Sequence, residues 1–195
     1  MSKQLKNALK GMPLHLQQVE GIRFGKTKLD YLCINTPPVC NYRCEKCFTW
    51  AGRHKLENFI GIPKIKTVLK KGKEMGVKTV GILGEGEPLL FPEIKEIVSY
   101  IHKLGMISLI ATNGSLLVKE MVDFLYANGA TIALSLDTLD KKEYKKFCRG
   151  SADIDVIKNN LEYARKVFAQ DIVEKNGYRV YRLAIHMTVT TKNYQ

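Results

Sequence analysis

The chain has 195 residues, of which 45% are apolar and 26% charged, and this balance excludes a disordered, collagen-like or coiled-coil protein. Its formal net charge is +12, which favours anionic ligands such as nucleic acid, phosphates or an anionic cofactor. The lysines are scattered opposite apolar stripes, however, so the charge alone does not indicate nucleic-acid binding. Because the sequence contains neither a bilayer-length apolar run nor an apolar signal core, we expect a cytoplasmic protein with no membrane partner.

The sequence predicts a basic leader over residues 1–28 and one domain over residues 29–195, in which strands and helices alternate. The predicted strands are 31–34, 79–83, 107–111, 131–134 and 180–189. The predicted helices lie near 63–76, from 92 to about 101, around 117–128, shortly before 149 and around 157–168. This alternation indicates right-handed crossovers and an α/β fold with a parallel sheet, either open and doubly wound or curved like a barrel.

Polar or glycine-rich loops follow the first four predicted strands, and chemistry gathers at the carboxyl ends of strands in both architectures. The loops contain the cysteines after the first strand and the segments 84–88, 112–114 and 135–138 after the next three. They therefore predict a single site on one edge of the sheet. About five strand–helix units are present, whereas an eight-unit barrel uses about 250 residues, so we expect either a C-terminally incomplete chain or an element that covers the edge of the fifth strand.

Three of the five cysteines lie within eight residues, at Cys40, Cys44 and Cys47. Their odd total number and the crowding of the triplet argue against a disulfide framework. Structural zinc requires four ligands, usually in two pairs, and the sequence contains no second pair. Three thiolates on a four-iron cluster leave one iron open for substrate chemistry, so the spacing favours a cluster over zinc. Cys33 is predicted to be a core residue of the first strand, and Cys148 a helix residue with no role.

The cysteine triplet is followed by Gly86-Glu87-Pro88 after the second strand, and then by the motifs at 112–117, 135–140 and 147–150. In this order the motifs resemble the radical S-adenosylmethionine (radical SAM) superfamily, and the resemblance spans about residues 30–195. It implies a partial (βα) barrel of parallel strands, usually of six strand–helix units, of which the sixth is missing from this chain. The motif at 135–140 and the ending 189–193 are most similar to the branch that contains SPASM-type peptide maturases and the molybdenum-cofactor GTP cyclase.

The resemblance implies that Cys40, Cys44 and Cys47 hold a [4Fe–4S] cluster, whose open iron binds the amino and carboxylate groups of S-adenosyl-L-methionine. One electron, from a reductant such as flavodoxin or ferredoxin, then cleaves a carbon–sulfur bond. The resulting 5′-deoxyadenosyl radical abstracts hydrogen from a substrate, and the implied substrate is a peptide, a nucleotide or an RNA. The protein orients the cofactors and excludes water.

The same resemblance implies a binding site for S-adenosyl-L-methionine. Gly86 and Glu87 would receive the methionine ammonium through backbone carbonyls and the carboxylate. Ser135 and Arg149 would contact the ribose and carboxylate region, and Asn113 would line the same pocket. From the residues alone, Arg149 fits equally well as a cation at a helix C-terminus.

Two positions depart from the family pattern. Lys46 stands where an apolar or aromatic residue usually precedes the third cysteine, and Glu85 stands where many relatives have a glycine. The alternative function is a zinc-stabilised, basic nucleic-acid-binding module without catalytic activity.

Overall fold

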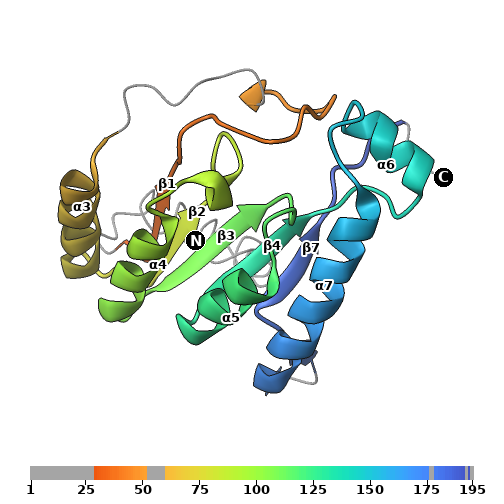
Figure 1. Ribbon diagram of the computed structural model, residues 1–195. Coiled ribbons are helices and arrows are strands. Elements are labelled where there is room, and N and C mark those ends of the chain that lie inside the picture. The colour runs from red at the N-terminus through yellow and green to blue at the C-terminus, as the bar shows by residue number, and fades with distance from the viewer. Residues whose placement is uncertain (1–28, 52–59, 176–177, 192, 194–195) are drawn as a thin grey trace, which may run out of the picture.

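The computed structural model describes residues 29–51, 60–175, 178–191 and 193 (Figure 1). The predicted leader, residues 1–28, lies outside the described residues. Five parallel strands form one sheet in the order β1-β2-β3-β4-β7. Their bounds are β1 Tyr31–Ile34, β2 Thr79–Ile82, β3 Ile107–Thr112, β4 Thr131–Ser135 and β7 Leu183–His186. The predicted alternation and parallel pairing are therefore confirmed.

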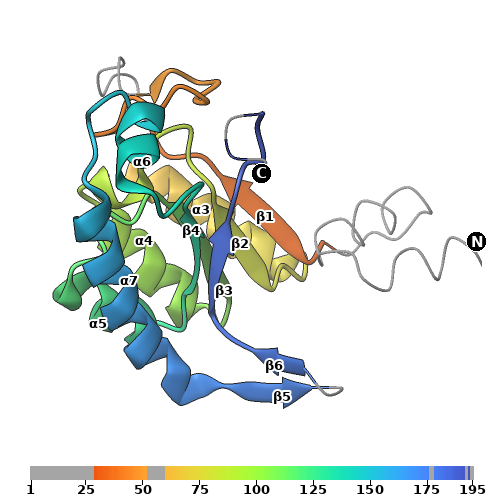
Figure 2. The same ribbon diagram turned by 90° about the vertical axis from the view of Figure 1, so that its right-hand side faces the viewer.

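Helices connect the strands and cover one face of the sheet (Figures 1 and 2). The helical elements are α3 Ile62–Glu74, η3 Pro88–Leu90, α4 Ile94–Lys103, α5 Lys119–Ala127, α6 Lys141–Phe147, α7 Ile154–Phe168 and η4 Ala169–Asp171. Each long helix turns an apolar stripe towards the sheet, as Ile94, Ile97 and Ile101 do on α4. Among the described elements, no helix is both long and apolar enough to cross a membrane.

The hydrophobic core lies between this helical layer and the sheet. Successive strand residues point to opposite faces, so Val80, Ile110 and Leu134 are fully buried against the helices. The alternate positions of the same strands, such as Ala111 and Ala133, face the other side of the sheet and are only partly buried. Burying the apolar positions on one face fixes the register of each strand and therefore brings all the strand ends to one edge.

Two expectations differ from the structure. The predicted strand 180–189 is shorter, and a separate antiparallel pair, β5 Val173–Lys175 and β6 Tyr178–Val180, precedes it (Figure 2). The sequence between these strands is Asn176-Gly177, the dipeptide that most favours a two-residue hairpin, and this signal was missed. The prediction that Cys33 is a core residue is also wrong. Cys33 is exposed because β1 is an edge strand and its side chain lies on the face that the described helices leave uncovered (Figure 2).

Candidate active site

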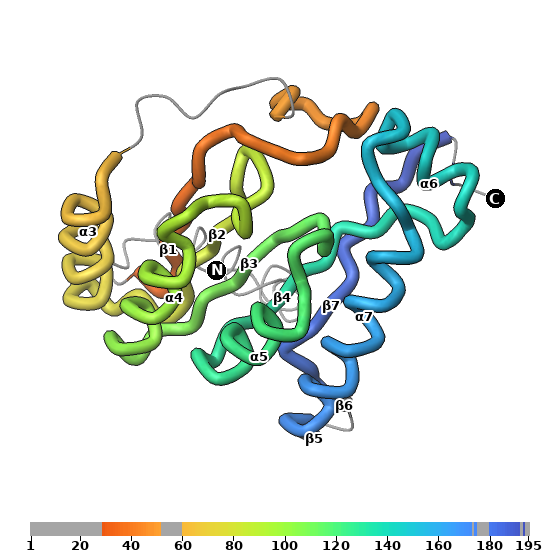
Figure 3. The backbone as a smooth tube through the Cα atoms, viewed as in Figure 1, coloured from red at the N-terminus to blue at the C-terminus, as the bar shows by residue number. Residues whose placement is uncertain are grey.

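The three clustered cysteines lie on the segment after β1, residues 35–51, which we call the cysteine loop. The loop passes over the carboxyl ends of the strands from β1 towards α6 (Figures 1 and 3). Tyr42 is buried and joins the loop to the core. The thiols of Cys40, Cys44 and Cys47 are partly exposed, so they face a position that a ligand can reach.

Two hydrogen-bond donors approach the sulfur of Cys40, and the sulfur of Cys47 lies beside a hydroxyl. The backbone N–H of Tyr42 donates to Cys40 Sγ over 3.3 Å, and Asn113 Nδ2 donates to the same sulfur over 3.7 Å. Cys47 Sγ lies 3.3 Å from Thr49 Oγ1. Burial raises the pKa of the Cys40 thiol to about 11. A metal group must therefore displace a proton from Cys40, and the donors around its sulfur then stabilise the thiolate.

The glycine-rich loop after β2 packs directly against the cysteine loop. The N–H of Glu87 donates to the carbonyl of Val39 over 2.8 Å. A Cβ atom at Gly86 would lie 2.2 Å from Val39 O and 2.6 Å from Val39 N, so only glycine fits there. Val39 immediately precedes Cys40. The close approach of Gly86 to Val39 therefore helps to set the position of the Cys40 thiol, and the missing side chain leaves the Gly86 carbonyl accessible.

The carboxylate of Glu87 is buried, with 2% of the residue exposed, and accepts three hydrogen bonds. Oε1 accepts from Leu89 N over 3.1 Å and from Thr112 Oγ1 over 2.6 Å, and Oε2 accepts from Asn113 N over 2.7 Å. Burial raises the pKa of Glu87 although these donors oppose the shift. A carboxylate offers about four acceptor positions, so roughly one remains for a cation.

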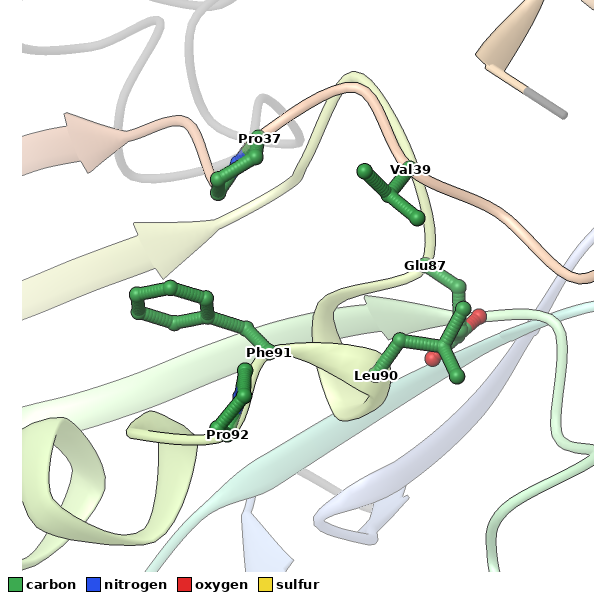
Figure 4. A pocket seen from close by; sticks show the side chains of 6 residues that line it. All are labelled: Pro37, Val39, Glu87, Leu90, Phe91 and Pro92. Atoms are coloured by element: carbon green, nitrogen blue, oxygen red, sulfur yellow. The ribbon is translucent and has the colours of Figure 1, made fainter. Parts of the chain in front are cut away.

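A small cavity lies beside Glu87 (Figure 4). It has a volume of about 40 Å³ and is lined by Pro37, Val39, Glu87, Leu90, Phe91 and Pro92. This space accommodates one or two water molecules and is too small for a nucleoside-sized cofactor.

Asn113 joins β3 to the cysteine loop. Its Nδ2 donates to Asn41 Oδ1 over 2.9 Å, while its Oδ1 accepts from the N–H and the hydroxyl of Ser115. Asn41 in turn donates to Ser115 Oγ over 2.8 Å. The predicted site residue Asn113 is thus placed beside Cys40, and its side chain orients the loop.

Lys46 makes an ion pair with Asp137, in the loop after β4. Both side chains are largely buried, with 20% and 10% exposed, and Lys46 Nζ also donates to Thr188 Oγ1 over 3.1 Å. Asp137 Oδ1 accepts from Thr188 N over 2.9 Å. The residue that departs from the family pattern therefore connects the cysteine loop to the ends of β4 and β7.

Ser135 and Arg149 occupy different parts of the same edge. Ser135 ends β4, is partly buried and pairs in register with His186 of β7. Arg149 follows α6 with a positive φ of 50°, and its guanidinium lies 5.7 Å from the ring centroid of Trp50 in the cysteine loop. This geometry agrees with Arg149 as a cation at the C-terminal end of α6. It also agrees with a position beside the cysteine loop.

Comparison with known proteins identifies the family. A family model described as the radical SAM superfamily matches residues 34–174. The chain belongs to the radical SAM superfamily. The predicted resemblance is thereby confirmed.

The radical SAM relatives include enzymes and a peptide-bound structure. The chain is similar to the probable GTP 3′,8-cyclase of Methanococcus maripaludis (34% identity over 136 residues, 69% of this chain and 45% of the relative). It is also similar to the GTP 3′,8-cyclase of Aliarcobacter butzleri (30% identity over 151 residues, 74% and 45%). Among solved structures, Streptococcus suis SuiB bound to precursor peptide SuiA matches with a TM-score of 0.64 and 26% identity, over 84% of this chain and 35% of SuiB. The chain thus spans about half the length of the curated relatives it matches.

The donor set fits a radical SAM cluster better than a single ion. Within the described ranges, no three Cys, His, Asp or Glu side chains converge closely enough to hold one metal ion. The thiols of Cys40, Cys44 and Cys47 nevertheless share one loop, with two donors to the sulfur of Cys40. Three spaced thiolates with hydrogen bonds to sulfur suit an iron–sulfur cluster, whereas structural zinc requires a tight tetrahedral shell.

Sequence reasoning did not find the residues that hold the site together. Asn41, Thr112, Ser115 and Asp137 make the contacts between loops, and no role was predicted for any of them although Thr112, Ser115 and Asp137 lay in recognised motifs. Their polar character was visible at the ends of strands, but their partners lie 25 to 91 residues away in the chain. Cys148 was predicted to have no role, and its thiol lies 3.7 Å from that of Cys44.

Proposed function

We propose that residues 29–195 form the core domain of a radical SAM enzyme, which reductively cleaves S-adenosyl-L-methionine and uses the product to abstract hydrogen from a substrate. The observation that carries this proposal is the junction of the cysteine loop with the Gly86-Glu87 segment through the hydrogen bond from Glu87 N to Val39 O. This contact supports the proposal because it joins the loop that contains the three cysteines to the Gly86-Glu87 segment, in a chain of the radical SAM superfamily.

In this proposal Cys40, Cys44 and Cys47 hold a [4Fe–4S] cluster, with one iron left for the cofactor. The bound cluster and cofactor supply the electron transfer and the bond cleavage that generates a 5′-deoxyadenosyl radical. The partly exposed thiols leave room for the cofactor on the open side of the loop. The hydrogen bonds to Cys40 Sγ keep this ligand oriented before the cluster is loaded.

The remaining site residues would bind S-adenosyl-L-methionine. The carbonyl of Gly86 and the last acceptor position of Glu87 would receive the methionine ammonium, whose positive charge offsets the cost of the buried carboxylate. Asn113 would line the pocket beside the first thiol. Ser135 and Arg149 would contact the ribose and the carboxylate, and the position of Arg149 over Trp50 holds its charge near the cysteine loop.

We infer that the substrate is a nucleotide, a peptide or an RNA. The names of the relatives support the first two classes, because the curated relatives are GTP 3′,8-cyclases and SuiB was solved with a precursor peptide. The net charge of +12 suits the phosphates of a nucleotide or an RNA. A flavodoxin or a ferredoxin would supply the electron. The alternative of a zinc-stabilised binding module is not favoured, because it gives no account of the family match or of the buried Glu87.

The test is an anaerobic reconstitution with iron and sulfide, followed by reduction, addition of S-adenosyl-L-methionine and detection of 5′-deoxyadenosine. We expect a brown protein that forms this product, and no product from the triple variant Cys40→Ala, Cys44→Ala, Cys47→Ala. The variant Cys33→Ala is the matched control, because Cys33 is an exposed cysteine outside the loop. A colourless protein that retains zinc and does not cleave S-adenosyl-L-methionine would contradict the proposal.

A further inference from the structure

We propose that Cys44 and Cys148 form a redox pair, which is oxidised to a disulfide in the cluster-free protein and reduced by a dithiol, itself oxidised to a disulfide, before the cluster is loaded. Their Sγ atoms lie 3.7 Å apart, although the residues are 104 positions apart in the chain. All five cysteines of the chain are free thiols in the described structure, and this pair provides its only thiol-to-thiol hydrogen bond.

Two hydrogen bonds, one on each side of Cys44, hold the chain segments around this pair together. The N–H of Glu45 donates to the carbonyl of Phe147 over 2.8 Å, and the N–H of Arg43 donates to Ser151 Oγ over 3.0 Å. The neighbours of Cys44 are therefore fixed against residues before and after Cys148. A disulfide requires an S–S separation of about 2.05 Å, so side-chain rotation has to bring the two sulfurs about 1.7 Å closer while these contacts hold the backbones together.

The two thiols differ in access, which suggests their order of reaction. Cys44 is partly exposed, whereas Cys148 is 4% exposed and packs in the core cluster. A low-molecular-weight disulfide such as glutathione disulfide can therefore be attacked first by the Cys44 thiolate, which forms a mixed disulfide and releases one glutathione thiolate. The Cys148 thiolate then attacks Cys44 Sγ and releases the second. Two electrons pass from the cysteine pair to the oxidant, which leaves as two thiols.

The consequence for the cluster rests on the proposed function. Cys44 is the middle ligand of the proposed cluster, so the disulfide and the cluster exclude each other. The pair would also protect the cluster-free protein, because a thiol held in a disulfide is not oxidised irreversibly to sulfinic or sulfonic acid. Cys148 is outside the loop, so its loss leaves all three proposed cluster ligands in place.

The first test maps disulfides in the full chain without its cluster. The protein is incubated with glutathione disulfide, blocked with N-ethylmaleimide and digested without reduction for mass spectrometry. We expect free thiols to fall from five to three, with one peptide that joins Cys44 to Cys148. The exposed-cysteine control Cys33→Ser should keep this link, and both Cys148→Ser and Cys148→Ala should lose it. A link from Cys44 to Cys40 or Cys47 in the wild-type protein, or five thiols that remain free, would overturn the proposal.

The second test measures iron bound to the oxidised protein with and without prior reduction by dithiothreitol. We expect the oxidised protein to bind iron and sulfide only after reduction, and the Cys148 variants to bind the same amount as the reduced wild-type protein. If the Cys44–Cys148 link forms but the reduced protein binds no iron, the redox pair stands and the proposed function fails. If the reduced protein binds iron but no link ever forms, the proposed function stands and the pair fails.

Discussion

The contact between Gly86 and Val39 can be broken by a single methyl group. In the variant Gly86→Ala the new Cβ would lie 2.2 Å from Val39 O, and real Cβ atoms essentially never approach closer than 3.0 Å. The two backbones must therefore separate by about 0.8 Å. The clashing atoms are all backbone atoms of Val39, so no side chain can rotate away to relieve the clash.

The expected loss of stability follows from the contacts that this separation of the backbones breaks. The hydrogen bond from Glu87 N to Val39 O is 2.8 Å long, and leaving a buried donor without a partner costs about 1–3 kcal/mol. Overpacking a well-packed site costs a further 1–3 kcal/mol or so. We therefore expect Gly86→Ala to lower the free energy of unfolding by about 2–6 kcal/mol. Because Val39 precedes Cys40, we also expect weaker iron binding.

The assay is urea unfolding of the cluster-free protein, followed by circular dichroism. Gly61→Ala is the matched control, since a Cβ at Gly61 would meet only Pro63 Cδ, at 3.7 Å. This position is the N-cap of α3, where alanine is less favourable than glycine by up to about 1 kcal/mol, so the control measures a glycine-to-alanine change without a clash. If Gly86→Ala is as stable as Gly61→Ala and binds iron equally well, the close contact does not determine the position of the loop and the reasoning is wrong.

Three further predictions concern neighbouring contacts. Burial raises the pKa of Glu87 above 4.5, so its stabilising contribution is greatest below pH 4.5 and is lost as the pH rises through the folded pKa. The unfolding free energy of the wild-type protein minus that of Glu87→Gln should therefore fall with rising pH, and a difference independent of pH would contradict this. Lys46→Met should destabilise the fold by about 1–3 kcal/mol because it leaves Asp137 without its cation, and a double-mutant cycle with Asp137→Asn should show coupling rather than additivity. Arg149→Ala should increase acrylamide quenching of Trp50, the sole tryptophan, and unchanged quenching would show that the guanidinium does not shield the ring.

The fold could be predicted from the sequence because hydrophobic periodicity reports which residues are buried. The segments 31–34, 79–83, 107–111 and 131–134 were predicted to within one residue of the observed strands. The last strand was less accurate, because a run of apolar residues does not distinguish the hairpin β5–β6 from the sheet strand β7. Cys33 was misplaced for a related reason, since alternation alone does not say which face of an edge strand is covered.

The site was predictable to the extent that it follows strand order. The carboxyl ends of parallel strands share one edge, so the thiols, Glu87 and Asn113 were expected together, and hydrogen bonds join Asn113 to both Glu87 and Cys40. The partner of each polar group was not predictable, because such pairs depend on loop conformation rather than on periodicity. Lys46 was visible as an exception to the family pattern, but its partner Asp137 is 91 residues away.

The contacts between loops explain how the cysteine loop is positioned although most of it is neither helix nor strand. Val39 is held by the loop after β2, Asn41 by the loop after β3, and Lys46 by the loop after β4. Each of these loops starts from a strand whose register is fixed by the buried face of the sheet. The spacing of the three thiols is therefore set by the hydrophobic core through separate polar contacts. Precise positioning of side chains at a site requires such supporting contacts on rigid elements.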